Sequence, residues 1–141
     1  VQALIQQPDC DISTLAVKRA EPQELNNPHC VKVVFDHSGK ALYFSRSPLV
    51  SSKTGDFYKH IGIYAYRREA LLKFCSLVPS SFEIAEKLEQ LRALQNGMKI
   101  QVCVVEEDTI AVDTPQDIQK VEDYLKKRDL SRVKISTKEG S

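Results

Sequence analysis

Residues 80–105 read SSFEIAEKLEQLRALQNGMKIQVCVV and contain the two most regular patterns of the sequence. Ser80, with Glu83 three residues later, forms a capping box, which is typical of the start of a helix. Apolar residues then recur at helical spacing up to Gly97, which favours a helix end; they are Ile84, Leu88, Leu91 and Leu94. Residues 99–105 form a short apolar run typical of a buried strand. We therefore predict one helix between Ser80 and Gly97, followed by a strand.

Similar patterns extend outward from this stretch. Residues 60–66, HIGIYAY, are too apolar for a half-exposed strand and predict a buried one, and residues 67–77 indicate a short helix after it. Residues 10–17 predict a further strand. Residues 31–35 and 41–44 flank a sequence with turn chemistry, so they indicate a β-hairpin.

The remaining segments complete the expected architecture. Residues 47–56 have the composition of a mobile surface loop. Thr114 with Pro115 predicts the start of a last helix, one face of which is formed by Ile118, Val121 and Leu125. The alternation of helices and buried strands predicts an α/β sandwich with a largely parallel sheet and one protruding hairpin.

The chain has 141 residues, enough for one domain or a piece of one. We expect residues 1–129 to belong to this domain and residues 130–141 to be a charged, frayed tail. The first residues begin an apolar helical pattern without an initiating Met or a capping residue. We therefore expect residue 1 to be a cut within a longer protein.

Composition excludes several classes of function. The net charge of +1 comes from 20 basic and 19 acidic side chains that are interspersed, which argues against nucleic acid as a partner. No apolar run approaches the roughly 20 residues that span a membrane, and the first residues do not resemble a signal peptide. A cytoplasmic location is expected by default. The cysteines lack metal-ligand spacing and are expected to be reduced and structural; they are Cys10, Cys30, Cys75 and Cys103.

Asp113 is the most informative single residue, because it follows the expected strand at 99–105 and immediately precedes the N-cap of the last helix. In open α/β sheets, ligands gather at the carboxyl ends of strands, and a helix N-terminus favours phosphate. A carboxylate there suits Mg²⁺ that is shared with substrate phosphates. The alternative interpretation is that Asp113 only helps to cap the helix.

Four further residues are each open to two interpretations. His60 is a hydrogen-bonding group at the edge of a pocket or a satisfied core histidine. Glu89 and Gln90 flank the apolar stripe of their helix and either reach into a cleft or face water. Arg46 ends a hairpin strand, where it either grips a carboxylate bidentately or forms a surface salt bridge.

A family resemblance favours the functional interpretations. The segments NPHCVKVVFDHSGKALYFSRSP, HIGIYAYR, LEQLRALQNGMKIQV and VDTPQDIQKVEDYL appear in this order, within residues 27–125. Together they resemble the C-terminal half of the 3-deoxy-manno-octulosonate (Kdo) cytidylyltransferases, or CMP-Kdo synthetases. This resemblance implies the C-terminal part of a Rossmann-like α/β/α sandwich of the nucleotide-diphospho-sugar transferase type.

The resemblance also implies a reaction. The anomeric hydroxyl of Kdo would attack the α-phosphate of CTP, giving CMP-Kdo and pyrophosphate for lipopolysaccharide assembly. Asp113 of VDTP would be a catalytic Mg²⁺ ligand, and the sugar pocket would be formed by Arg46, His60, Tyr64, Glu89 and Gln90. Catalysis would rest on positioning and electrostatics. The nucleotide-binding residues of the family have no counterpart and would lie upstream of residue 1, so this chain alone is expected to bind CTP poorly.

Two details depart from the family pattern: no glycine-containing turn precedes VDTP, and the loop after FSRSP has Leu49 and Val50 where the family has isoleucine-proline. The alternatives are a cytidylyltransferase for another acidic sugar, such as a sialic acid, and a non-catalytic dimerisation or sugar-binding module of the same fold. The apolar hairpin at 31–46 predicts a homodimer, as the resemblance does, with Val33, Phe35 and Leu42 in the interface.

Overall fold

The computed structural model describes residues 1–51, 55–106 and 122–123. The chain divides into two units, Val1–Asp108 and Thr109–Ser141, and the following description concerns the first. Its elements, in chain order, are α1 (Gln2–Gln6), β1 (Ile12–Arg19), α2 (Pro22–Leu25), β2 (Lys32–Phe35), β3 (Ala41–Ser45), β4 (Phe57–Tyr66), α3 (Arg68–Ser76), α4 (Ser81–Glu86), α5 (Gln90–Gln95) and β5 (Ile100–Val105).

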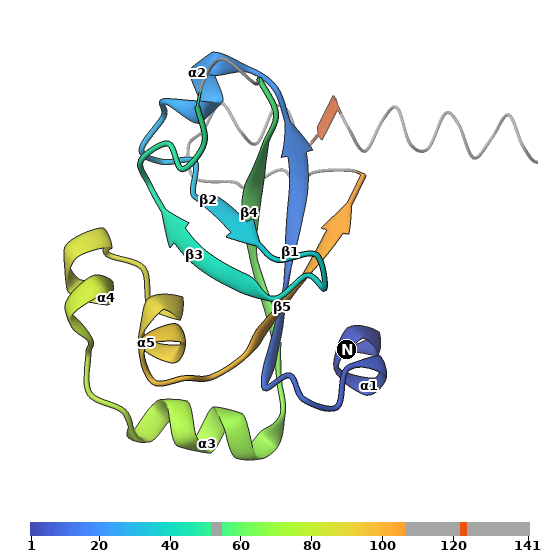
Figure 1. Cartoon of the computed structure of the whole chain (residues 1–141), viewed down its shortest axis with the longest axis vertical. Helices are drawn as coiled ribbons and strands as arrows, with labels where there is room; N and C mark the ends of the chain where they lie inside the picture. Colours follow the sequence, from blue (N-terminus) through green and yellow to red (C-terminus); the bar gives the residue numbers. More distant parts are fainter. Residues whose placement is uncertain (52–54, 107–121, 124–141) are drawn as a thin grey trace, which may run out of the picture. The chain divides into compact units, whose positions relative to one another are not determined.

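The strands form one mixed sheet in the order β3-β2-β4-β1-β5 (Figure 1). Only β1 and β5 pair in parallel; β1 with β4, β2 with β3 and β2 with β4 are antiparallel. The expectation of a largely parallel sheet is therefore wrong for the described strands. The reason is that parallel neighbours need a long crossover connection, whereas β2 and β3 are joined by a tight turn and β4 returns beside β2.

The hairpin predicted at 31–35 and 41–44 is confirmed, but it does not protrude. Its turn docks on β5: the backbone oxygen of Gly39 accepts a hydrogen bond from the Val102 amide at 2.7 Å, and that of Ser38 accepts one from the Gln101 side chain at 2.9 Å. Gly39 has a φ of +86°, and a Cβ atom there would lie 2.3 Å from the Gln101 side-chain nitrogen. The turn thus requires glycine for both its conformation and its close approach.

The hairpin residues expected in a dimer interface differ in exposure. Val33 is only 1% exposed and belongs to the core of the chain itself, so its expected place in an interface is wrong. Phe35 is half-buried against Tyr58, with ring centroids 4.7 Å apart. Leu42 is 61% exposed, as an interface residue of a single chain should be. Alternation along the strands does not explain this difference, because Val33 and Phe35 are two positions apart on β2 and share a face. The register between β2 and β3 shifts after Val34 and skips Leu42, which leaves that side chain exposed.

The core lies between the sheet and the helices α3, α4 and α5, which gather on one side of β1 and β5 while α1 lies on the other (Figure 1). The helices contribute Ala70, Phe74, Leu91 and Ala93, the connection between α4 and α5 contributes Leu88, and the strands contribute Ile12, Ala16, Val33, Phe44, Ile100 and Val102. The predicted strands at 10–17, 60–66 and 99–105 and the helix at 67–77 are confirmed as β1, β4, β5 and α3.

The single helix expected between Ser80 and Gly97 is wrong, because the chain breaks it into α4 and α5. The capping box of Ser80 and Glu83 is confirmed. Lys87, however, has a φ of 57° and a ψ of 47°, the left-handed conformation that ends a helix. Leu88, directly after the break, lies in the core and is 6% exposed, whereas Ile84 in α4 is 65% exposed. These two residues therefore do not form the continuous apolar stripe that the spacing indicated.

β4 contains a bulge opposite β1. Thr14 pairs with Tyr64, but the next residue, Leu15, pairs with Ile61, so the two residues between them on β4 have no partner in the register. Ile63 in this bulge is 51% exposed, and the strand is consequently not buried along its whole length as expected. Bulges of this kind change the direction of nearby side chains and are common beside binding sites.

The remaining expectations concern the cysteines, membrane crossing and the C-terminal segments. All four cysteines are free; Cys10 and Cys30 are buried, as expected of structural residues, whereas Cys103 is partly buried and Cys75 is exposed, so the structural role expected for Cys75 is wrong. Within the described segments, no helix has the length and apolarity that crossing a membrane requires. Part of the loop at 47–56, the last helix from Thr114, the domain boundary at residue 129 and the tail at 130–141 lie outside the described residues.

Candidate functional site

His60 lies in β4 with its ring against the core. It is 9% exposed, and its Nε2 atom lies 2.9 Å from the hydroxyl of Thr14 in β1. The ring packs edge-on against Phe44, with centroids 5.0 Å apart, and against Tyr64 at 5.5 Å. Burial lowers the pKa of His60 from 6.5 to about 4, because the charged imidazolium would lose its water. His60 is therefore neutral near pH 7.

The Thr14 hydroxyl determines how this histidine is protonated. It lies 2.9 Å from the backbone oxygen of Ile63 in the bulge and 3.3 Å from that of Ile61, the last paired residue before the bulge. A hydroxyl has one proton, and these carbonyl oxygens can only accept it. The Thr14 oxygen must then accept from Nε2–H of His60, which leaves Nδ1 of the neutral ring as a hydrogen-bond acceptor.

Tyr64 follows His60 along β4 and brings a phenol to the same place. Its ring lies between those of His60 and Tyr66, with centroids 5.5 Å and 6.0 Å away. Burial raises the pKa of Tyr64 strongly, and the charges of Tyr66 and Glu89 raise it further, so the phenol keeps its proton. The charge of Glu89 therefore reaches Tyr64, although 25 positions separate the two in the sequence.

Glu89 and Gln90 stand at the beginning of α5, directly after the break at Lys87. Glu89 is the N-cap residue and is exposed, whereas Gln90 is 8% exposed. Helix α5 packs against β3, the strand that carries Phe44. The structure therefore brings His60 and Tyr64 together, with the Glu89 charge acting on Tyr64 from the start of α5, and Gln90 is the neighbour of Glu89 in the chain.

Arg46 uses its guanidinium inside the chain. Nε donates to the backbone oxygen of Glu86 at 3.1 Å, Nη1 to that of Pro28 at 3.0 Å, and Nη2 to that of Lys87 at 3.4 Å. The surface salt bridge that the sequence left open is not what these bonds form, because all three acceptors are backbone carbonyls. Sequence reasoning could not see this, since two of the acceptors lie about 40 residues away.

Sequence reasoning missed three residues beside this group. Thr14 is a buried hydroxyl in β1 and follows the likewise buried Ser13, so the sequence of the strand does not single it out. Tyr66 is half-buried, and its pKa is raised by burial and by Glu89. Glu86 accepts hydrogen bonds from the end of β3, for which no local pattern exists in the sequence.

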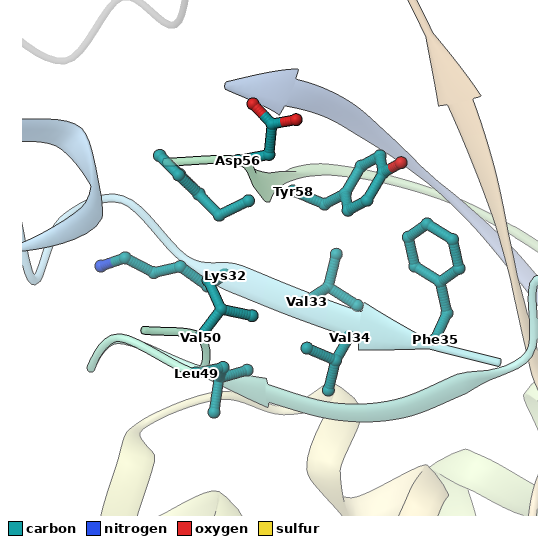
Figure 2. Close-up of a pocket in the computed structure, with 9 residues that line it drawn as sticks. Lys32, Val33, Val34, Phe35, Leu49, Val50, Asp56 and Tyr58 are labelled. Carbon is teal, nitrogen blue, oxygen red and sulfur yellow. The ribbon is translucent and has the colours of Figure 1, made fainter. Parts of the chain in front are cut away.

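A separate pocket of about 170 Å³ lies beside β2 and the N-terminal end of β4 (Figure 2). It is mainly apolar and includes the stem of Lys32, whose Nζ donates to the backbone oxygens of Asn27 at 2.7 Å and Arg46 at 2.6 Å. Its lining residues are Lys32, Val33, Val34, Phe35, Leu49, Val50, Asp56, Phe57 and Tyr58. None of the expected sugar-pocket residues is among them, so we base the candidate site on the polar group around His60.

The group around His60 offers neutral hydrogen-bonding atoms and one carboxylate. Imidazole Nδ1 and the Glu89 carboxylate accept hydrogen bonds, and the Tyr64 phenol can donate or accept. This combination suits the hydroxyl groups of a carbohydrate. Asp113, the expected metal ligand, lies outside the described residues, and within those residues no group of three or more His, Cys, Asp or Glu side chains is placed to hold a metal.

Comparison with known proteins gives consistent results. A family model described as Cytidylyltransferase matches residues 1–100. The 3-deoxy-manno-octulosonate cytidylyltransferase of Chlamydia felis (strain Fe/C-56) is 46% identical over 127 residues, which cover 89% of this chain and 50% of that protein. The enzyme of the same name from Geobacter sulfurreducens (strain ATCC 51573 / DSM 12127 / PCA) is 41% identical over 140 residues, with 89% and 56% covered.

A solved structure agrees with the sequence relatives. The structure of CMP:2-keto-3-deoxy-manno-octonic acid synthetase complexed with CTP has a TM-score of 0.83 and 36% identity to this chain, and the match covers 90% of this chain and 54% of that one. The chain thus spans about half the length of the curated relatives and of the solved structure that it matches.

Proposed function

Because the chain belongs to the cytidylyltransferase family, we propose that it forms the sugar-binding part of an enzyme that transfers CMP from CTP to Kdo. The products are CMP-Kdo, which supplies lipopolysaccharide assembly, and pyrophosphate. The relatives named above support this substrate pair, since they bear the name of that enzyme and their matches cover 89% of this chain. We expect the residues that recognise the nucleotide to lie in the part of the relatives that this chain does not match.

One observation carries the proposal: the His60 and Tyr64 rings pack together on β4, and the charge of Glu89 at the start of α5 acts on Tyr64. The His60 and Tyr64 rings are 5.5 Å apart, and the Glu89 charge acts on the Tyr64 phenol. Kdo has several hydroxyl groups, and a set of neutral acceptors and donors beside one carboxylate can bind them without a strong net charge. The carboxylate of Kdo would take a separate donor, and the remaining N–H groups of Arg46 are candidates for it.

Two further parts of the proposal concern cofactor and assembly. Asp113 would hold Mg²⁺ together with the phosphates of CTP, where the metal neutralises charge on the reacting phosphate. The residue type suits a hard cation, and its role rests on its sequence position alone. The enzyme would be a homodimer that uses the exposed face of the hairpin, with Leu42 at 61% exposure as the contact residue.

Sugar binding can be measured directly on the 141-residue chain. Calorimetry should detect saturable binding of Kdo, and Tyr64→Phe and Glu89→Gln should each weaken it by about tenfold, since the first removes a hydroxyl group and the second replaces an ionised acceptor with a neutral amide. Glu69→Gln is the matched control, because Glu69 is exposed in the first turn of α3. No saturable Kdo binding by the wild-type chain would contradict the proposal.

Two comparisons separate the alternatives. Tighter binding of a sialic acid than of Kdo would favour the enzyme for another acidic sugar. A polypeptide that joins the unmatched part of the Chlamydia felis relative to this chain should release pyrophosphate from CTP when Kdo is present. If this polypeptide binds Kdo but releases none, the non-catalytic module is the better interpretation.

A further inference from the structure

The carboxylate of Glu86 lies at the C-terminal end of a helix, where a negative charge is electrostatically unfavourable. It is the last residue of α4, where the helix dipole is negative and disfavours a carboxylate. Three donors from the end of β3 offset this: the Ser45 hydroxyl at 2.9 Å, the Arg46 amide at 3.2 Å and the Tyr43 phenol at 3.4 Å. Ser45 is 2% exposed, so its bond to the carboxylate is well shielded from water.

The Arg46 side chain in turn donates hydrogen bonds from the end of β3 to the end of α4. Its guanidinium donates to the backbone oxygens of Glu86 and Lys87, the two residues at which α4 ends. Its own backbone oxygen accepts from the buried Lys32 ammonium at 2.6 Å. β3 and the end of α4 are therefore joined by side-chain bonds running both ways, and Lys32 fixes the β3 side of the junction.

This junction surrounds the one non-glycine residue with a positive φ among those described, Lys87 at 57°. A non-glycine residue adopts this conformation only where the surrounding structure imposes it. The chain resumes as α5 only after this residue, so its conformation sets where Glu89 and Gln90 begin the next helix. A small change in the break would move both side chains relative to β4.

We propose that Glu86 is a positioning residue, whose carboxylate forms with Arg46 a latch that holds the break at Lys87 and thereby places Glu89 and Gln90 beside His60 and Tyr64. The inference deepens the proposed function and rests on it for the identity of the sugar. Glu86 itself does not contact the sugar. Its contribution is geometric, so a neutral side chain of the same shape should replace it.

The test compares Glu86→Ala with Glu86→Gln in the 141-residue chain. Glu86→Ala should weaken Kdo binding by about tenfold or more and increase amide hydrogen exchange of residues 88–92 selectively, because the break loses its support. Glu86→Gln should stay near the wild type in both measurements. Its amide oxygen can accept from the Arg46 amide, while its NH₂ group donates to the Ser45 hydroxyl.

Two controls separate positioning from general stability. Ile100→Val truncates a core residue that is 1% exposed in β5 and should lower the melting temperature without selective exchange in residues 88–92. If Glu86→Ala does not fold, Ser45→Ala removes one donor of the latch and should give the same changes on a smaller scale.

The outcomes against the proposal are specific. Equal losses of Kdo binding in Glu86→Gln and Glu86→Ala would overturn it, because they would show that the charge itself matters to the sugar. Unchanged exchange of residues 88–92 in Glu86→Ala would overturn it as well. If the wild-type chain binds no Kdo, the proposed function fails, and the exchange experiment still decides whether Glu86 holds the break.

Discussion

Acidification should destabilise this chain mainly through His60 between pH 7 and pH 5. The pKa of His60 is lowered by burial from 6.5 to about 4 in the folded state, whereas the unfolded chain has the ordinary value. The unfolded state therefore binds more protons between these two values. Stability is complete above pH 6.5 and is lost as the pH falls towards 4. Linkage predicts a loss of about 2 kcal/mol at pH 5 and about 3 kcal/mol at pH 4.

The choice of pH range isolates this histidine from the carboxylates. Arg92 lowers the pKa of Glu83 mainly through its hydrogen bonds, and Ser38 does the same for Asp36. A carboxyl group with a lowered pKa contributes stability that is lost only as the pH falls below its ordinary value, near 4. Above pH 5 these groups stay ionised in both states, so the change in unfolding free energy reports on His60.

Urea unfolding followed by circular dichroism at pH 7.5, 6 and 5 measures the effect. The wild-type chain should lose about 2 kcal/mol more than His60→Gln between pH 7.5 and pH 5, because glutamine does not titrate. His37→Gln removes an exposed imidazole from the hairpin turn and is the matched control. The same pH dependence in the wild type and in His60→Gln would refute the reasoning, since it would mean that the ring is protonated in the fold without cost.

Three further predictions concern the turn, the interface and the metal. Gly39→Ala should cost about 1–3 kcal/mol more than Gly97→Ala, because both require a left-handed conformation but only the new Cβ at position 39 would meet other atoms within 4 Å; chemical unfolding compares them. In light scattering of the polypeptide that joins this chain to the unmatched part of the Chlamydia felis relative, Leu42→Asp should turn a dimer into a monomer, and an unchanged dimer would exclude this surface. In the same polypeptide, Asp113→Asn should remove most Mg²⁺-dependent pyrophosphate release, and near-normal turnover would exclude the metal role.

Local patterns predicted what local interactions determine. The strand at 60–66 and the capping box of Ser80 and Glu83 were found because side-chain periodicity and cap chemistry act within a few residues. The direction of the strands was predicted wrongly. A buried strand has the same apolar sequence pattern in parallel and antiparallel sheets. The pairing of β1 with β4 depends instead on contacts between residues about 50 positions apart in the sequence.

The break between α4 and α5 shows the same limit more sharply. Apolar spacing from Ile84 to Leu94 favours one continuous helix, and lysine at position 87 is an ordinary helix former. The left-handed conformation is accompanied by bonds from Arg46, and by the ion pair of Arg92 with Glu83, in which Nη2 lies 2.5 Å from Oε1. These tertiary bonds outweigh a local preference of a few tenths of a kcal/mol per residue.

The candidate site depends on both irregularities, which is why its residues could be named from the sequence but not assembled. The bulge in β4 separates the pairing of Ile61 from that of Tyr64, and the Thr14 hydroxyl bonds to the carbonyl oxygens of Ile61 and Ile63 there. The break at Lys87 starts α5 so that Glu89 acts on Tyr64. A regular strand and a continuous helix would direct these side chains elsewhere. The two departures from regular structure are therefore the features that bring the polar groups together.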